Sequence, residues 1–346
     1  MEAVEARAGA GQAERPRGAR LRLDHKGFKV GLPAAILLVL LSLPWWGTGY
    51  VVRTATLIVM FIALTQAWNI LSGFGGYVSI GHVAFFGVGA YTTGILMSTL
   101  GLPFAVGVIG GAGAAALLAA LVGYPILRLH GHYFAVGTFA LAEAIRHLAE
   151  NATWLTGGGM GFRMPLFQGT PQFTMAFFFY LMLAFMLLAI GVAAAISRSM
   201  LGYSLRAIRE DEQAAGAMGI NTPNVKARAF VISGALVGLG GSIYGYWIAF
   251  LEPFSLFSVD ISIQLLVIAM IGGVGTVIGP IIGAVIFLVI EELVWAGFLQ
   301  LHLLVMGLVL ILVILFVPNG IADLLRRGRR ALTKDGLLEN IRKYKV

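Results

Sequence analysis

Residues 174–196 have the sequence TMAFFFYLMLAFMLLAIGVAAAI, a stretch of 23 residues without a charged side chain. About 20 apolar residues in an α-helix are enough to cross the roughly 30 Å hydrocarbon core of a bilayer. A helix also satisfies its own backbone N–H and C=O groups, which the water-free bilayer core requires. This stretch therefore predicts a transmembrane helix.

The rest of the chain has the composition of an integral membrane protein. Of its 346 residues, 59% are hydrophobic and 12% are charged, and its mean hydropathy is +0.89, whereas a soluble domain carries about 25% charged residues. We therefore expect an all-α integral membrane protein, a polytopic bundle of about ten transmembrane helices. The expected spans lie near residues 32–50, 51–71, 82–99, 103–123, 132–150, 174–196, 228–250, 261–275, 277–296 and 300–317.

Basic residues assign the parts of the chain to the two sides of the membrane. Twenty of the 24 lysines and arginines lie in segments 1–29, 197–228 and 321–346, which the positive-inside rule places in the cytoplasm. Six spans before the middle segment and four after it agree with this, so both termini are expected in the cytoplasm. We expect basic tails at 1–29, which is disordered, and at 321–346, on either side of a transmembrane domain at 30–320. Topology explains the three clusters, so no nucleic-acid partner is expected.

The same arrangement leaves several charged residues outside. It places Arg53, Arg146 and Arg163 there and puts six acidic residues at or toward the outer side: Glu143, Glu150, Glu252, Asp260, Glu291 and Glu292. Glu143, Arg146 and Glu150, with His147, follow the i, i+3, i+4, i+7 pattern of one helix face. Ionisable residues in a membrane are functional candidates, so these are candidates for an outer-face site. The alternative is a solvated helix end with local ion pairs.

Two of the expected spans carry small residues at every fourth position. One stripe comprises Gly107, Gly111, Ala115, Ala119 and Gly123, and the other comprises Gly234, Gly238 and Ser242. Small residues let helix backbones approach closely in lipid. The stripes therefore predict close helix packing within the chain, or alternatively a seam between two chains.

Two glycine-rich segments interrupt the apolar pattern at roughly corresponding places in the two halves: SGFGGYVSIGH at 72–82 and IGGVGTVIGP at 271–280. Paired interruptions of this kind indicate a transport pathway, because unwound backbone can face a cavity near the midplane. The alternative is two tight cytoplasmic turns, which glycine also favours. The candidates for the translocation path are Gly73, Gly75, Gly76, Ser79, Gly81, Gly272, Gly273, Gly275 and Thr276.

The sequence contains no recognisable catalytic or cofactor motif. No GxxxxGK[ST] segment occurs, so ATP that drives transport would have to be bound by a partner. No HExxH pair and no cysteine occur, and neither a metal site nor a cofactor is expected. No nucleophile has a base beside it, so we do not expect an enzyme. A transporter driven by an ion gradient is a further alternative, but its midplane carboxylates are missing.

One charged loop, LRAIREDEQAAGAMGINTPNVK at 205–226, lies between two apolar runs. Its pattern predicts one short amphipathic helix from Leu201 to Gly219, ended by Pro223. The expected apolar contacts are Leu201, Leu205, Ile208 and Met218, and Ala214, Ala215, Gly216 and Ala217 form a small flank. Three consecutive acids would be repelled by an anionic inner leaflet. The pattern therefore favours a protein partner over a lipid surface.

Four separated segments resemble one known family, the membrane permease subunits of branched-chain amino acid ABC transporters of the LivM type. The segments are NILSGFGGYVSIGHVAFFGVGAYTTGIL (69–96), HGHYFAVGTFALAEAIRHLAENATWLTGGGMGF (130–162), LGYSLRAIREDEQAAGAMGINTPNVKARAFVISGALVGLGGSIYGY (201–246) and IGGVGTVIGPIIGAVIF (271–287). They occur in the family's order, and the resemblance covers most of residues 33–320.

The resemblance implies a permease subunit in a bacterial cytoplasmic (inner) membrane. It implies as partners a second homologous permease, two cytoplasmic ATP-binding subunits and an external, periplasmic solute-binding protein. The implied function is import of leucine, isoleucine or valine, with urea, short amides or other amino acids as alternatives within the family. Residues 212–219 resemble the family's coupling segment, although E-Q-A-A-G-A-M-G departs from the tighter E-A-A-x-x-x-G. The implied ATPase-coupling residues are Arg206, Arg209, Glu210, Asp211, Glu212, Ala214, Ala215 and Gly219.

Overall fold

A computed structural model describes residues 25–297, 307, 320 and 321 of the chain. The expected span at 300–317 and the expected tails at 1–29 and 321–346 lie largely outside these residues. The chain divides into two compact units, the first ending at Trp46 and the second beginning at Gly47. The described part of the first unit is α1 (His25–Trp46), which ends on two tryptophans, with the Trp46 indole donating to Ser42 Oγ at 3.2 Å.

The second unit is built from long α-helices. An α-helix occupies each of the predicted spans from 51–71 to 277–296: α2 (Gly49–Trp68), α3 (His82–Ser98), α4 (Phe104–Ile126), α5 (His132–Asn151), α7 (Pro171–Ser197), α10 (Thr222–Ile248), α12 (Val259–Gly272) and α13 (Gly279–Gly297). Among the described residues, five helical segments are long and apolar enough to cross a bilayer: 49–73, 104–126, 171–197, 222–248 and 253–272. The prediction of an all-α, multi-pass membrane protein is therefore confirmed.

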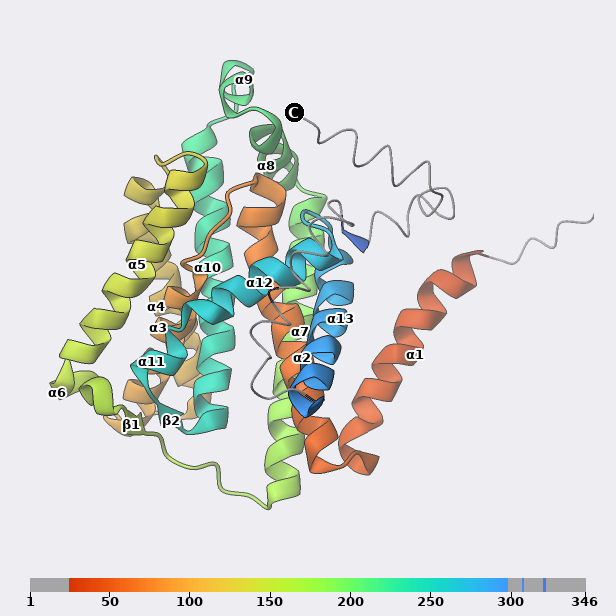
Figure 1. The fold of residues 1–346 in the computed structure, drawn as a ribbon, viewed down its shortest axis with the longest axis vertical. Coiled ribbons are helices and arrows are strands. Elements are labelled where there is room, and N and C mark those ends of the chain that lie inside the picture. The colour runs from red at the N-terminus through yellow and green to blue at the C-terminus, as the bar shows by residue number, and fades with distance from the viewer. Residues whose placement is uncertain (1–24, 298–306, 308–319, 322–346) are drawn as a thin grey trace, which may run out of the picture. The chain divides into compact units, whose positions relative to one another are not determined.

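Short elements mark the two ends of this unit (Figure 1). At one end, which we call the loop end, lie α8 (Met200–Glu210) and α9 (Glu212–Ala217). At the other, the strand end, β1 (Phe162–Arg163) pairs antiparallel with β2 (Phe250–Leu251), near α6 (Thr153–Thr156) and α11 (Pro253–Leu256). A 3₁₀ turn at Gly158–Met160 leads into β1. The charged loop and the connections that carry β1 and β2 are thus at opposite ends.

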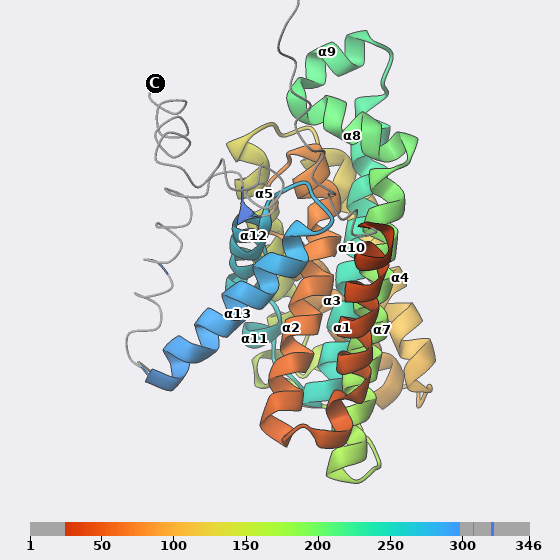
Figure 2. The same ribbon diagram turned by 90° about the vertical axis from the view of Figure 1, so that its right-hand side faces the viewer.

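Helix α10 is the centre of the second unit, where it packs against α2, α3, α4 and α7 (Figures 1 and 2). The buried residues of α4 are the five members of its small-residue stripe. A Cβ added at Gly238 of α10 would overlap Ala115 of α4, and one added at Gly111 would overlap Ser242. The two stripes therefore face each other, and packing within the chain is the alternative that the structure shows.

Candidate functional site

The charged loop folds into two helices rather than the single predicted one. Helix α8 ends at Glu210, Asp211 is extended with φ −158°, and α9 begins at Glu212. One carboxylate oxygen of Asp211 accepts hydrogen bonds from the backbone N–H groups of Gln213 and Ala214, at 2.8 and 2.9 Å. An N-cap residue has non-helical backbone angles. The prediction of one helix from Leu201 to Gly219 was wrong because Asp211 caps a new helix.

Two further details of that prediction are also corrected. Pro223 lies in the first turn of α10, where a missing N–H costs no helical hydrogen bond, and α9 has already ended at Ala217. Met218 is 85% exposed, so it makes no buried apolar contact. The predicted contacts of Leu205 and Ile208 are confirmed, because both side chains are buried.

Helix α9 presents a face of small, exposed residues. Ala214, Gly216 and Ala217 are exposed, and Gly219 follows them in a left-handed conformation with φ +89°. A Cβ added at Gly216 would meet no atom within 4 Å. We call these four residues the coupling face. The four residues themselves present no side chain larger than a methyl group.

Helix α8 is tied to the end of α2 by arginines. A guanidinium N–H of Arg209 donates to the backbone oxygen of Gly73 at 2.8 Å, and the stem of Arg209 packs against Gly76. Arg206 donates to the backbone oxygen of Ser197 at 2.7 Å, and its guanidinium lies 5.7 Å from the centre of the Phe74 ring. Both predicted coupling arginines therefore hold α8 in place from within the chain, while Glu210 is exposed.

The two glycine-rich segments, about 200 residues apart in sequence, meet each other beside Arg209. Helix α2 continues as a π-helix at Asn69–Gly73, and the Asn69 side chain bridges to the second segment. Its amide nitrogen donates to the backbone oxygen of Thr276 and its oxygen accepts from the N–H of Gly275, both at 2.9 Å. A Cβ at Gly73 would lie 2.9 Å from that same nitrogen of Gly275. Glycine at 73 therefore permits this close contact.

The first segment is irregular backbone inside the bundle. The Trp68 indole donates to the Ser79 carbonyl at 2.8 Å, and His82, at the start of α3, contacts Ser233 Oγ, which donates to the carbonyl of Ala67. Ser233 thus links the start of α3 to the last turn of α2. Side chains satisfy the freed N–H groups, because Ser72 and Thr138 accept from residues 79 and 80. Such backbone at membrane depth occurs only where protein or a cavity surrounds it.

The second segment is a compact turn at the end of α12. Thr276 Oγ1 donates to the Gly273 carbonyl and accepts from the N–H of Gly279, both at 2.9 Å. Ser79 differs, because its hydroxyl is buried and has no hydrogen-bond partner among the described residues. The geometry of residues 72–82 thus fits the interpretation of unwound backbone within the bundle. The geometry of residues 271–280 fits the alternative of a tight turn. The role of Gly75, Gly81, Gly272 and the other path candidates stays a prediction.

A charged network fastens α9 to the bundle. Lys226, 3% exposed in the second turn of α10, donates to Glu212, to the Tyr77 hydroxyl at 3.1 Å and to the Leu127 carbonyl at 3.0 Å. The Tyr77 hydroxyl also donates to the second carboxylate oxygen of Glu212, from which His130 Nε2 lies 3.5 Å away. The network joins α9 to the irregular segment that carries Tyr77.

The network favours the ionised form of Glu212. Burial opposes ionisation of this carboxyl group, but hydrogen bonds from Lys226 and Tyr77, and the positive charge of Lys226, outweigh it. The pKa of Glu212 is therefore held below its ordinary value. The Glu212 carboxylate bonds Lys226 and Tyr77 of the bundle, so it is not part of the coupling face.

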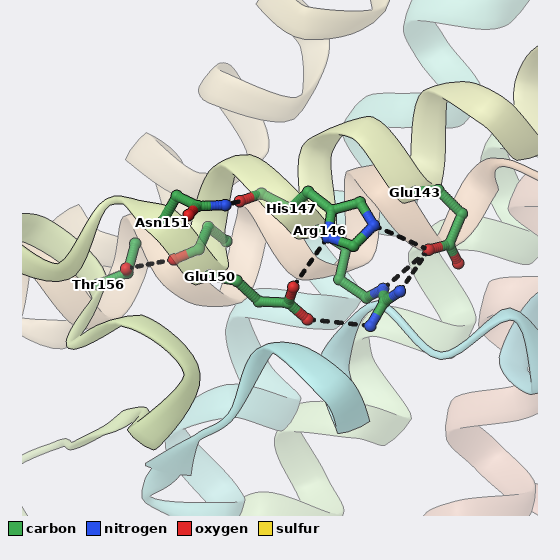
Figure 3. A network of polar contacts seen from close by, with 7 residues as sticks. Glu143, Arg146, His147, Glu150, Asn151 and Thr156 are labelled. Atoms are coloured by element: carbon green, nitrogen blue, oxygen red, sulfur yellow. Dashed lines mark hydrogen bonds and ion pairs between the residues drawn. The ribbon is translucent and has the colours of Figure 1, made fainter.

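The outer-face candidates lie together near the strand end of α5 (Figure 3). Arg146 forms two hydrogen bonds with Glu143, at 2.6 and 3.0 Å, and one with Glu150 at 2.9 Å. Glu150 also contacts His147 Nδ1 at 2.9 Å. The local ion-pair alternative therefore describes the geometry. Among the described residues, no group of three or more His, Cys, Asp or Glu side chains could hold a metal ion.

Sequence reasoning missed four polar residues of the loop end: Asn69, Tyr77, His82 and Lys226. A signal existed for Asn69, because an amide at the end of an apolar run is expensive in lipid unless it is bonded. In the sequence, Lys226 is only one of the five basic residues of segment 197–228, and nothing there marks it as buried. Tyr77 and His82 give no local signal of their pairing, since their partners are 135 and 151 residues away.

Comparison with known proteins gives one family for most of the chain. The family model described as branched-chain amino acid transport system / permease component matches residues 50–314. The chain belongs to this permease family. It is 28% identical to the high-affinity branched-chain amino acid transport system permease protein LivM of Escherichia coli (strain K12), over 84% of this chain and 74% of that protein.

Two Salmonella typhimurium (strain LT2) permeases give further matches. LivM of that organism is 29% identical, again over 84% of this chain and 74% of the relative. The permease protein LivH is 29% identical over 53% of this chain and 58% of its own length. No solved structure matches the chain. As a member of a transport permease family, the chain is a transporter component and not an enzyme.

Proposed function

We propose that this permease imports branched-chain amino acids, leucine, isoleucine or valine, as the membrane subunit of an ABC transporter. The relatives' names specify that substrate class. The proposed assembly contains a second homologous permease, two cytoplasmic ATP-binding subunits and an external solute-binding protein. The proposed setting is a bacterial inner membrane, with about ten spans, both termini in the cytoplasm and the loop end facing the ATPases.

The observation that carries the proposal is the connection from the coupling face to the interior. Helix α9 is fastened to Tyr77 through Glu212, and Arg209 of α8 bonds Gly73 where the two glycine-rich segments meet. A displacement of the α8–α9 pair by the ATPases would therefore act directly on the backbone at 73–79. Such a switch requires two states that differ in affinity for ATP or for the loaded binding protein.

A substitution on the coupling face tests the partner. We expect Gly216→Trp to weaken association with the ATPase subunits about tenfold or more, because a bulky side chain at the centre of a packed interface disrupts its complementarity. Gly216 is helical and faces open space, so the change leaves the permease's own packing intact. Co-purification of the ATP-binding subunits from detergent, at matched expression, measures the effect.

Gly191→Trp is the matched control. Gly191 is also helical, lies on α7, and a Cβ there meets no atom within 4 Å. We expect this variant to retain the ATPase subunits. Equal retention by both variants would contradict the assigned coupling face, and failure of the parent complex to import leucine, isoleucine or valine would contradict the proposed function.

A further inference from the structure

The further inference concerns Arg53, an arginine on the second turn of α2 that the loop-end site does not use. Arg53 makes no hydrogen bond or ion pair with any residue that the structure describes. Its neighbours Tyr50 and Leu57 lie on the same face of α2, at spacings of three and four residues. These three residues line two cavities at once. This face of α2 therefore lies between two neighbouring cavities toward the strand end.

The first cavity is largely apolar. It has a volume of about 730 Å³ and lies between α2, α7 and α10. Met175, Trp247 and Ile248 are among its apolar lining residues, with the Tyr244 ring beside Trp247. Ligand sites for small molecules commonly have volumes of about 300–1,000 Å³ and apolar walls with a few placed polar groups. The cavity is large enough for an aliphatic side chain.

The second cavity carries negative charge. It measures about 440 Å³ between α2, α12 and α13, and Gln264, Glu291 and Glu292 line it. The Tyr50 hydroxyl donates to one oxygen of Glu292. A guanidinium and two carboxylates thus line one hollow, and the apolar hollow adjoins it.

We propose that this strand-end site, Arg53 with the two cavities beside it, binds a free zwitterionic amino acid with an aliphatic side chain. The α-carboxylate pairs with Arg53, whose planar guanidinium matches a carboxylate with two parallel hydrogen bonds. The α-ammonium faces Glu292, and the aliphatic side chain rests in the apolar cavity against Trp247. Neighbouring carboxylates repel an anionic phospholipid headgroup that carries no ammonium group.

The inference rests on the proposed function, and it places the substrate where a loaded binding protein would deliver it. In the proposed topology the strand end faces outward. A site at this end receives the amino acid before the path at the loop end opens. Arg53 then provides the selectivity for a carboxylate at the permease itself.

A reporter thiol tests the site. The chain has no cysteine, so Leu57→Cys introduces a unique thiol on the strip of α2 that lines both cavities. In right-side-out vesicles we measure its modification by a negatively charged and a positively charged methanethiosulfonate. We expect millimolar L-leucine to slow both reactions, and 4-methylpentanoate and 3-methylbutylamine, each lacking one charge, to slow them far less. Leu148→Cys, an exposed position on α5, is the control that leucine leaves unchanged.

A second experiment substitutes Arg53 in the same reporter variant. With Arg53→Gln added, we expect leucine protection to weaken about tenfold or more, since a charge-assisted pair is replaced by a neutral contact. Loss of the positive charge should also lower the rate of modification by the anionic reagent relative to the cationic one. Unchanged protection in Arg53→Gln, or protection that follows the anionic phospholipid content of the vesicles rather than leucine, would overturn the site. If the parent complex takes up leucine but leucine gives no protection in Leu57→Cys, this inference alone is overturned. If the parent complex takes up no leucine, the proposed function is overturned.

Discussion

Lys226 is the residue on which the loop end depends most. Its ammonium group is almost fully buried, and Glu212, its one charged partner among the residues that the structure describes, keeps 20% of its side-chain surface exposed. Removing one partner of a buried ion pair costs about 3–5 kcal/mol, because the remaining charge is left uncompensated. The partial exposure of Glu212 reduces that cost, since solvent screens the pair.

We therefore expect Glu212→Gln to destabilise the permease by about 2 kcal/mol, because it leaves the buried ammonium without a counter-charge. Lys226→Met should also destabilise it, whereas the double variant should be more stable than the sum of the two effects predicts, by at least about 1 kcal/mol. Thermal unfolding in detergent measures all three. Additive effects would show that the two side chains do not interact.

The pH dependence of stability provides a separate check. The folded state holds the pKa of Glu212 below its ordinary value of 4.5, so on acidification the unfolded state takes up this proton first. The carboxylate's contribution is therefore complete above that pH and is lost as the pH falls below it. The stability advantage of the parent over Glu212→Gln should shrink in acid. Glu210→Gln, at an exposed neighbouring position, should show no such change.

At the scale of elements, the contact between α4 and α10 is unusually close because both helices present small residues. Helix association in lipid relies on packing, since lipid tails are as apolar as the helices. Gly238 also faces α3, where a Cβ added at Gly89 would overlap the backbone of Gly238. Three helices thus converge on one glycine, which leaves no space for a larger side chain.

Gly238→Leu is expected to destabilise the bundle by at least about 2 kcal/mol, because overpacking forces the helices apart. Gly113→Leu on α4 is the matched control, since a Cβ there meets nothing within 4 Å, and it should change stability little. Thermal unfolding of the two variants in the same detergent compares them. Equal stability would mean that the α4–α10 seam is not close-packed in the membrane.

At the scale of the whole molecule, the loop end and the strand end should face opposite sides of the membrane. Met218 beside α9 and Met160 before β1 are 85% and 87% exposed, respectively, so they form a matched pair of reporter positions. In the cysteine-free chain, we expect an impermeant maleimide to label Met218→Cys only in inside-out vesicles and Met160→Cys only in right-side-out vesicles. Labelling of both from one side would contradict the proposed topology.

Much of this architecture follows from the sequence, because hydropathy and charge act locally along the chain. An apolar run such as 174–196 must form a helix in lipid, and α7 occupies it. The small-residue stripe of α4 predicts its packing face from the sequence alone, and its five members are the buried residues of that helix. The charged loop at 205–226 was likewise evident, although the capping of α9 by Asp211 was missed because an acidic residue can either continue a helix or cap one.

The pairings that make the site were decided only by the tertiary structure. Asn69 bonds Gly275 across 206 residues, and Tyr77 bonds Glu212 across 135. Nothing in the local sequence around Tyr77 specifies such a partner, because a buried polar group needs some hydrogen bond and many residues can supply it. The sequence by itself therefore determined which segments enter the membrane and which one carries charge. Packing of the helices decided that the two glycine-rich segments contact each other and that Lys226 pairs with Glu212. It also decided which cavities Arg53 lines.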